Sequence, residues 1–162
     1  MEKNIIKIAI VIRDKENPEN VLLIKEKVEK SSVAKWNIIK GTCETQKEDI
    51  FEAAVRECFE EASVHIRIES SLGCFFVSKE DGSTSIQFNF LASIGSGNIG
   101  IQDKNFQKKL GENISEVRWF DKSEIAGMDD SEFVSPRTKL LLDNWMNGRT
   151  YPLDSISVME EK

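Results

Sequence analysis

The chain has 162 residues, of which 40% are hydrophobic, and its formal net charge at pH 7 is −6. This length and composition suffice for one sizeable core, and no apolar stretch is long enough to span a membrane. The negative charge argues against a general nucleic-acid surface, which needs a basic patch, but it does not exclude a small anionic substrate, because a bound metal ion reverses the local charge.

Apolar stretches near the start of the chain predict β-strands. Residues 3–13 carry isoleucine at every second position from Ile6 to Ile12, which gives a strand one fully apolar face. Residues 21–24 form a continuous apolar run, which is typical of a strand covered on both faces. A further strand-like stretch, residues 36–44, includes a loop that begins at Gly41.

The next segment predicts a helix that starts near Thr45. Thr45 and Glu48 fit the T-x-x-E capping box, in which two side chains satisfy backbone donors at the start of a helix. Counting 100° per residue from there places Glu57, Glu60 and Glu61 within one turn of each other on one face. The helix therefore presents three carboxylates side by side.

These three carboxylates are candidate metal ligands. Like charges at this spacing repel one another, and in a cleft the cost rises steeply unless a cation lies between them. Oxygen ligands alone favour Mg²⁺, Mn²⁺ or Ca²⁺ over Zn²⁺. Taken alone, the run is also typical of a solvated acidic helix face. Arg56 stands one turn before Glu60, where a guanidinium can hold a carboxylate by paired hydrogen bonds.

The rest of the chain predicts strands, a hairpin and a second helix. Asp81-Gly82 predicts a tight hairpin turn. Residues 93–111 show little periodicity and are expected to form a loop. Ser135 and Pro136 open a C-terminal helix with a cap and a first-turn proline. The strands are expected at residues 64–68, 72–78, 84–92 and 116–120.

Strands mixed with two main helices in this order imply an α/β fold, an α/β/α sandwich around a mixed sheet. We expect residues 1–153 to form a single domain and residues 154–162 a loosely ordered acidic tail, because no repeat or linker interrupts the chain. The three cysteines are odd in number and lack metal-ligand spacing, which is typical of the reducing cytosol. With no signal-like segment at the start, we expect a cytoplasmic protein. A homodimer is compatible with these features.

The stretch from Gly41 to Val64 resembles the Nudix box, whose family pattern is G-x5-E-x7-R-E-U-x-E-E-x-G-U with U aliphatic. The R-E-x-x-E-E core is complete and the E-x7-R spacing is kept. Three features depart from the family. Six residues instead of five separate Gly41 from Glu48, Lys47 stands where the family usually has glycine, and Ser63 replaces the final glycine. If position 63 requires a left-handed backbone, the serine costs on the order of 1 kcal/mol. The residues that occupy the defined positions of the pattern are Gly41, Glu48, Arg56, Glu57, Cys58, Glu60, Glu61, Ser63 and Val64.

The resemblance implies a Nudix-like fold and a pyrophosphohydrolase that uses Mg²⁺ or Mn²⁺. Members of the family hydrolyse a nucleoside diphosphate linked to another group, X, so the implied partner is a small-molecule nucleotide. Carried over by matching position, Glu57, Glu60 and Glu61 become metal ligands, and Arg56 and Glu48 organise them. Each of these residues also counts as a candidate catalytic residue.

Three further positions follow from the resemblance. The family commonly places another acidic residue just before the strand at 116–120, and Glu112 and Glu116 are the matching candidates for a metal ligand or general base, a role also open to Glu57. Single acids in a polar loop are more often surface residues. Lys40-Gly41 resembles the opening of the box in dinucleoside polyphosphate hydrolases, which makes both residues candidate substrate contacts.

The sequence leaves other functions open. The altered glycine loop favours a non-catalytic nucleotide-binding sensor or regulatory module on the same fold, and a calcium-stabilised structural domain is a third reading. The identity of X is equally open. Candidate substrates are nucleoside triphosphates, dinucleoside polyphosphates, ADP-ribose, sugar nucleotides and capped RNA 5′ ends.

Overall fold

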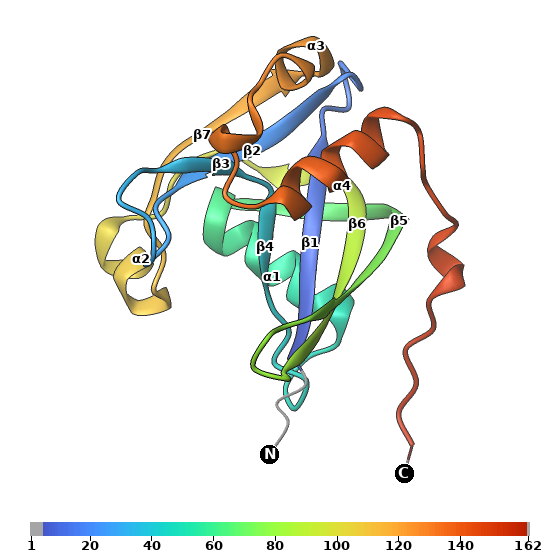
Figure 1. The fold of residues 1–162 in the computed structure, drawn as a ribbon. Helices are drawn as coiled ribbons and strands as arrows, with labels where there is room; N and C mark the ends of the chain where they lie inside the picture. The colour runs from blue at the N-terminus through green and yellow to red at the C-terminus, as the bar shows by residue number, and fades with distance from the viewer. Residues whose placement is uncertain (1–4, 162) are drawn as a thin grey trace.

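The computed structural model describes residues 5–161, which form a seven-stranded mixed sheet between two layers of helices (Figure 1). This arrangement confirms the α/β/α sandwich expected from the sequence. The strands are β1 (Ile5–Arg13), β2 (Asn20–Glu26), β3 (Lys35–Asn37), β4 (Ile39–Thr42), β5 (Val64–Ser78), β6 (Thr84–Gly97) and β7 (Ile114–Asp121). The helices are α1 (Ile50–Ala62), α2 (Lys104–Leu110), α3 (Lys122–Ala126) and α4 (Pro136–Met146), with short 3-10 turns η1 (Asp130–Glu132) and η2 (Leu153–Ser155).

Strand β1 lies at the centre of the sheet and has different partners along one edge. The strand order is β3-β2-β1-β6-β5, with β4 paired to β1 and β7 paired to β2. One edge of β1 pairs with β6 in parallel. On the opposite edge, β2 pairs with Ile12 and Arg13, whereas β4 pairs with residues 7–10. Strands β2 and β4 therefore diverge from the same edge of β1.

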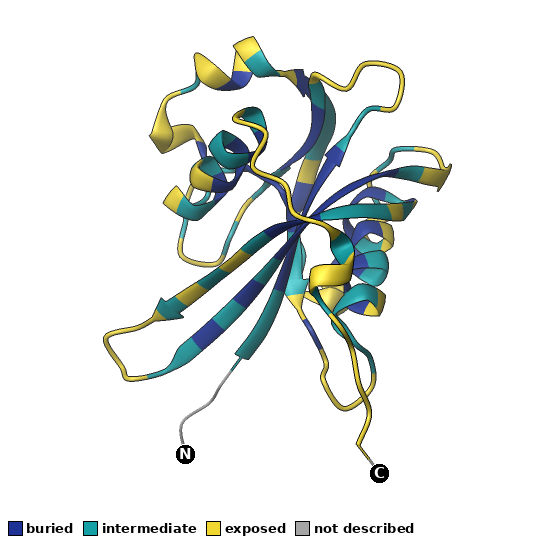
Figure 2. Ribbon diagram, turned by 90° about the vertical axis from the view of Figure 1, so that its right-hand side faces the viewer, coloured by how far each residue is buried: buried dark blue, intermediate teal, exposed yellow. Residues whose placement is uncertain are grey.

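The period-two alternation of the strands divides the core into two clusters, one on each face of the sheet. In β1, Ile8, Ile10 and Ile12 face α1, whereas Ala9 and Val11 face α4. All of these side chains are fully buried, and buried stretches concentrate in the strands between the helix layers (Figure 2). The continuous apolar run of β2 is likewise buried on both faces, as its sequence predicts.

Helix α1 begins later than the sequence analysis predicts. Its N-cap is Asp49, whose Oδ1 accepts hydrogen bonds from the backbone N–H groups of Phe51 and Glu52, and the Glu52 side chain accepts from the Asp49 N–H in return. The predicted Thr45–Glu48 box is wrong because a second box of the same type lies four residues further on. Residues 45–47 form a turn instead.

The predicted loop over residues 93–111 is also wrong. Strand β6 continues to Gly97, and the short helix α2 follows between an Asp103 N-cap and Gly111, which adopts a left-handed backbone with φ of 73°. Strand β5 joins two predicted strands into one, because irregularities in its pairing with β6 let it bend without breaking. The hairpin turn around Asp81-Gly82 is confirmed.

The segment after α4 returns along the sheet to the side of α1. Tyr151 bridges to Ser71 of β5, and Leu153 and Ile156 then pack against the cluster that contains α1. Among residues 5–161, no helix is long and apolar enough to cross a membrane.

Replacing Ser63 by glycine is expected to stabilise the protein. Ser63 caps the C-terminus of α1 with φ of 60° and ψ of 26°, the left-handed conformation that the sequence analysis anticipated. A β-carbon is disfavoured there, so Ser63→Gly should raise the free energy of unfolding by about 1 kcal/mol and the melting temperature by about 2–4 °C. Urea and thermal unfolding measure this change. Ser63→Ala keeps the β-carbon and should give no gain; a lower melting temperature for Ser63→Gly would contradict the argument.

Candidate metal and catalytic site

Three carboxylates from two separate segments converge at the gap where β2 and β4 diverge. Glu57 and Glu61 project from the second half of α1, and Glu112 follows the C-cap of α2. One oxygen from each lies within 4.8 Å of the other two. Residues more than fifty positions apart thus form one acidic cluster.

The surroundings of these carboxylates disfavour the ionised form. Glu57 is 6% exposed and Glu61 2%. Burial raises the pKa of Glu57 to about 7 although Arg56 opposes the shift, and burial together with the charge of Glu26 raises the pKa of Glu112 to about 7. Burial and the neighbouring acids also raise the pKa of Glu61 well above its usual value. A cation among them would reverse these shifts.

The backbone of β4 lies directly against the two helical carboxylates. A β-carbon built on Gly41 would lie 1.9 Å from Oε1 of Glu57, so only glycine fits beside this carboxylate. The backbone N–H of Lys40 donates to Oε2 of Glu61 at 3.4 Å. Gly41 and Lys40 are the two residues predicted as substrate contacts. Gly41 allows the Glu57 carboxylate to pack against the β4 backbone, and Lys40 contacts Glu61 through its backbone N–H.

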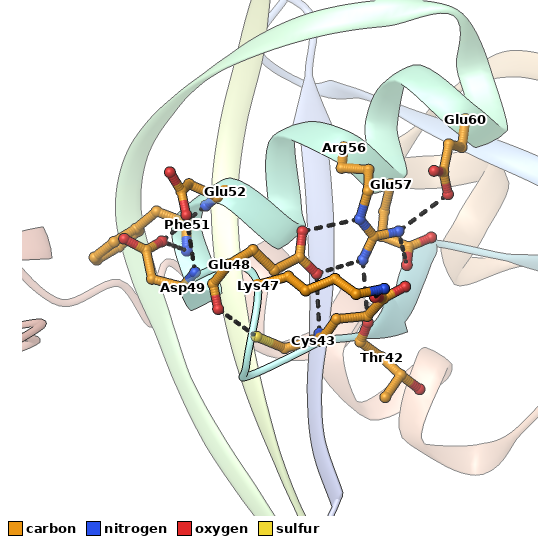
Figure 3. A network of polar contacts seen from close by, with 11 residues as sticks. Thr42, Cys43, Lys47, Glu48, Asp49, Phe51, Glu52, Arg56, Glu57 and Glu60 are labelled. Atoms are coloured by element: carbon orange, nitrogen blue, oxygen red, sulfur yellow. Dashed lines mark hydrogen bonds and ion pairs between the residues drawn. The ribbon is translucent and has the colours of Figure 1, made fainter.

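Arg56 organises the acidic residues on one side of the cluster (Figure 3). Its guanidinium binds Glu48 through two hydrogen bonds of 2.9 and 2.7 Å. A third nitrogen donates to Glu57 at 2.8 Å and to Glu60 at 3.0 Å, and the carbonyl of Thr42 accepts another bond. The hydrogen bond from Arg56 lowers the pKa of Glu48. Arg56 thus connects α1 to the loop after β4.

The extra residue between Gly41 and Glu48 is accommodated in a tight turn. The N–H groups of Lys47 and Glu48 both donate to the carbonyl of Glu44, and the Glu44 N–H donates to the Glu48 carboxylate. The turn takes up the insertion before Glu48, so the pair between Glu48 and Arg56 still forms. The longer loop leaves this contact intact.

The remaining candidate acids are not among the three converging carboxylates. Glu60 pairs with Arg56 at 3.0 Å and lies beside the cluster, where its charge acts on Glu57 and Glu112. Glu116 faces Arg118 at 3.7 Å and is exposed, with a side-chain exposure of 46%.

Glu26 is a further acid near this site, and the sequence analysis did not single it out. Glu26 is the last residue of β2 and accepts a hydrogen bond from Asn37. Burial is the main cause of the raised pKa of Glu112, and the charge of Glu26 is the next. For Glu61, burial and Glu112 contribute most, and Glu26 raises the pKa further. No spacing connects Glu26 to the Nudix box, and its neighbourhood depends entirely on the fold.

The residues present fit a hard divalent cation. In octahedral coordination with bonds of about 2.1 Å, neighbouring oxygens lie about 3.0 Å apart and only opposite oxygens reach about 4.2 Å. The carboxylate oxygens lie within 4.8 Å of one another, so side-chain movements of about 1–2 Å bring all three within bonding distance of one Mg²⁺. Oxygen donors alone suit Mg²⁺ or Mn²⁺.

A cavity of about 1130 Å³ opens beside Glu112. Its walls come from the end of β2 and the loop that follows, from α2 and the residues before it, and from residues 111–115. Small-molecule sites commonly occupy 300–1,000 Å³, so the cavity is large enough for a nucleotide. The acidic cluster therefore borders a space that a substrate can enter.

Comparison with known protein families tests whether the chain belongs to the family that the Nudix box suggests. A family model of the NUDIX domain matches residues 3–141. The chain belongs to the Nudix family. No curated protein matches the chain.

Solved structures of Nudix proteins share this fold. A NUDIX hydrolase from Nitrosomonas europaea superposes with a TM-score of 0.77 at 23% identity, covering 97% of this chain and 98% of that one. The NUDIX domain of Shewanella oneidensis NrtR, complexed with ADP ribose, gives 0.67 at 14% identity over 91% and 90%. A C. elegans Ap4A hydrolase gives 0.63 at 16% identity over 89% and 96%. At these identities the likeness concerns the fold alone.

Introducing a methyl group at Gly41 is expected to disrupt metal binding. In Gly41→Ala the new β-carbon would overlap the Glu57 carboxylate, which must then leave its position. We expect Mg²⁺ affinity to fall by about 10- to 100-fold, measured as the Mg²⁺ concentration that raises the melting temperature half-maximally. Gly127→Ala is the matched control, because its β-carbon meets only backbone oxygens at 3.6 Å. Wild-type Mg²⁺ affinity in Gly41→Ala would exclude the site.

Stabilisation by Mg²⁺ is expected to increase between pH 6 and pH 8. The folded-state pKa values of Glu57 and Glu112, about 7, exceed the usual value near 4.5. Without metal, the two acids therefore make the folded protein less stable as the pH rises through 7, because they must then ionise in a buried position. Mg²⁺ binds the deprotonated carboxylates and restores stability at the higher pH. Melting temperatures with Mg²⁺ and with EDTA at both pH values measure this effect. An equal Mg²⁺ effect at both pH values would contradict the prediction, and Glu112→Gln should reduce the difference.

Proposed function

We propose that the chain is a divalent-metal-dependent hydrolase that cleaves a pyrophosphate linkage in a nucleoside diphosphate linked to another group, X. The observation that carries the proposal is the convergence of Glu57, Glu61 and Glu112 beside an open cavity in a Nudix fold. Three clustered carboxylates cannot bind an anionic diphosphate directly, so the substrate requires a cation between them. Mg²⁺ or Mn²⁺ is the expected cofactor.

The chain's own residues then have distinct roles. Glu57, Glu61 and Glu112 hold the cation, which when bound neutralises the phosphate oxygens and acidifies a water molecule. Arg56 fixes Glu57 and Glu60 through charge-assisted hydrogen bonds at 2.8 and 3.0 Å. Glu48 positions Arg56 in turn, and Glu60 completes the acidic wall of the site.

Glu112 is the best candidate for the general base. The carboxylate of Glu57 is held by Arg56, whereas that of Glu112 has no hydrogen bond or ion pair within residues 5–161. Burial raises the pKa of Glu112 to about 7 in the metal-free site, and a bound cation would lower it, which would leave the carboxylate ionised with an oxygen free to accept a proton from water. Glu116, paired with Arg118 outside the cluster, is less suited to this role.

Removing the charge of Glu61 or Glu60 tests the enzymatic proposal. We expect purified protein with Mg²⁺ or Mn²⁺ to release phosphate products from at least one member of a panel of nucleotides. The value of kcat should fall about a hundredfold or more in Glu61→Gln and Glu60→Gln, because an interaction made mainly in the transition state is lost. Glu80→Gln, in the exposed β5–β6 turn, is the matched control and should keep full activity.

A nucleotide sensor would give a different result. Its signature is saturable binding of a nucleotide by the parent protein with no turnover of any panel member. The insertion before Glu48 is the feature that favours such a module, but the turn it forms preserves the pair between Glu48 and Arg56. Catalysis is therefore the function that the geometry supports best.

A further inference from the structure

A polar row crosses the sheet on the face opposite α1. Lys40 of β4, Ala9 of β1 and Asn89 of β6 lie directly opposite one another in register, so their side chains share one face and neighbouring strands are about 4.8 Å apart. In the next row, Lys7 lies opposite Gln87. Ala9, between Lys40 and Asn89, is fully buried in the apolar cluster beneath α4.

A third cation covers these rows. Arg137 lies in the first turn of α4, the helix that packs on this face. Its neighbour Thr138 donates a hydrogen bond of 2.6 Å to Asn37, which fixes the start of α4 close to the β3–β4 connection. Lys7, Lys40 and Arg137 are all partly buried. Three positive charges therefore share one region.

These three cations lack the acidic partners that most other charged side chains here possess. Within residues 5–161, no carboxylate lies within 4 Å of the charged nitrogens of Lys7, Lys40 or Arg137. Burial comes first in lowering the pKa of Lys7 and Lys40, and the charge of Arg137 lowers both further, while the charge of Glu26 opposes the shift at Lys40 and ranks before that of Arg137. The cations repel each other, and an anion between them would relieve that repulsion.

One buried donor in these rows also lacks an acceptor. The amide of Gln87 donates to Oδ1 of Asn89 at 2.8 Å, which leaves the Asn89 Nδ2 group as a donor. Asn89 is completely buried, and within the described part of the chain this nitrogen has no hydrogen-bond partner. An unpaired buried donor is costly. A ligand that offers only acceptors, such as a phosphate, matches both the cations and this amide.

The cation region lies next to the acidic cluster. Lys40 and Gly41 are consecutive residues of β4, so Lys40 faces the cations while Gly41 backs Glu57 on the other side. The charges of Glu57 and Glu61 act on Lys7 and Lys40 respectively. A phosphate chain bound at the acidic cluster by a metal ion therefore reaches the cations by crossing the edge of β4.

We propose that Lys7, Lys40 and Arg137 bind a phosphate group that extends beyond the hydrolysed pyrophosphate. The preferred substrates then carry at least three linked phosphates, as nucleoside triphosphates and dinucleoside polyphosphates do, and ADP-ribose and sugar nucleotides are poor substrates. This inference rests on the proposed function for the position of the pyrophosphate.

Binding of inorganic phosphates to the full chain in excess Mg²⁺ tests the site without turnover of a nucleotide. By calorimetry, tripolyphosphate should bind about tenfold or more tightly than pyrophosphate, as expected for added charge-assisted hydrogen bonds. In the double variant Lys7→Gln/Arg137→Gln this preference should fall to less than about threefold, with pyrophosphate affinity unchanged. Lys109→Gln removes one exposed charge from α2 and should keep the full preference.

The outcomes separate this inference from the proposed function. Equal affinities of wild-type protein for the two phosphates, or a full preference in the double variant, would overturn the cation site while hydrolysis could still be observed. Conversely, a preference for tripolyphosphate without turnover of any nucleotide would support the cation site and refute the enzyme. Unfolding curves verify that the double variant is folded. If it is not, Lys7→Gln alone is used instead, and its preference for tripolyphosphate over pyrophosphate should lie between those of the wild type and the double variant.

Turnover gives a second readout in the active protein. In Lys7→Gln the kcat/KM for a nucleoside triphosphate should fall about tenfold, whereas that for ADP-ribose should change by less than about twofold. Equal losses for both substrates would show a general structural role for Lys7 and overturn its assignment to the third phosphate.

Discussion

The contact between the β4 backbone and the buried carboxylates of α1 determines most of the other features of the site. Glu57 and Glu61 are 6% and 2% exposed, a position in which an ionised carboxylate is costly unless a cation or several donors accompany it. The helix nevertheless packs closely, because Gly41 has no side chain to separate it from Glu57. Bringing Glu112 to the same place adds further repulsion. The fold thus maintains an unfavourable arrangement of acidic groups that a divalent cation would relieve, as the proposed metal site requires.

Arg56 offsets part of the repulsion between these carboxylates. Its guanidinium neutralises Glu48 with two short bonds and shares one nitrogen between Glu57 and Glu60. Among residues 5–161, Glu61 receives only the Lys40 N–H at 3.4 Å. The acids closest to Arg56 are therefore fixed in position, and Glu61 and Glu112 remain under-compensated. The same guanidinium explains how the loop tolerates one more residue than the family pattern. The loop has to present Glu48 to Arg56, and the turn after Glu44 achieves this with the extra residue in place.

The sequence predicts those parts of the structure that depend on local periodicity. The alternation in β1 and the unbroken apolar run of β2 predict strands with the observed burial, and the left-handed backbone at Ser63 follows from its position in the box. Helix α2 is missed because it has only seven residues, mostly exposed, and so lacks an apolar stripe; its signals are confined to the Asp103 cap and Gly111. The start of α1 is misplaced because two capping boxes compete. Glu26 and Arg137 reach the site only through tertiary packing, which no sequence spacing encodes.

The sheet also shows how an acidic protein could be suited to the polyanionic substrate that we propose. Successive residues of a strand point to opposite faces, so β4 separates a group of carboxylates on one side from Lys40 and its neighbouring cations on the other. Without metal, the opposite charges partly compensate each other across the strand, as the effects of Glu57 on Lys7 and of Glu61 on Lys40 indicate. Binding of a cation to the acids removes that compensation and leaves the lysines more attractive to an anion. The metal ion and the phosphate chain should therefore bind cooperatively, because a cation bound at the carboxylates strengthens the attraction of the lysines for an anion, and the reverse also holds.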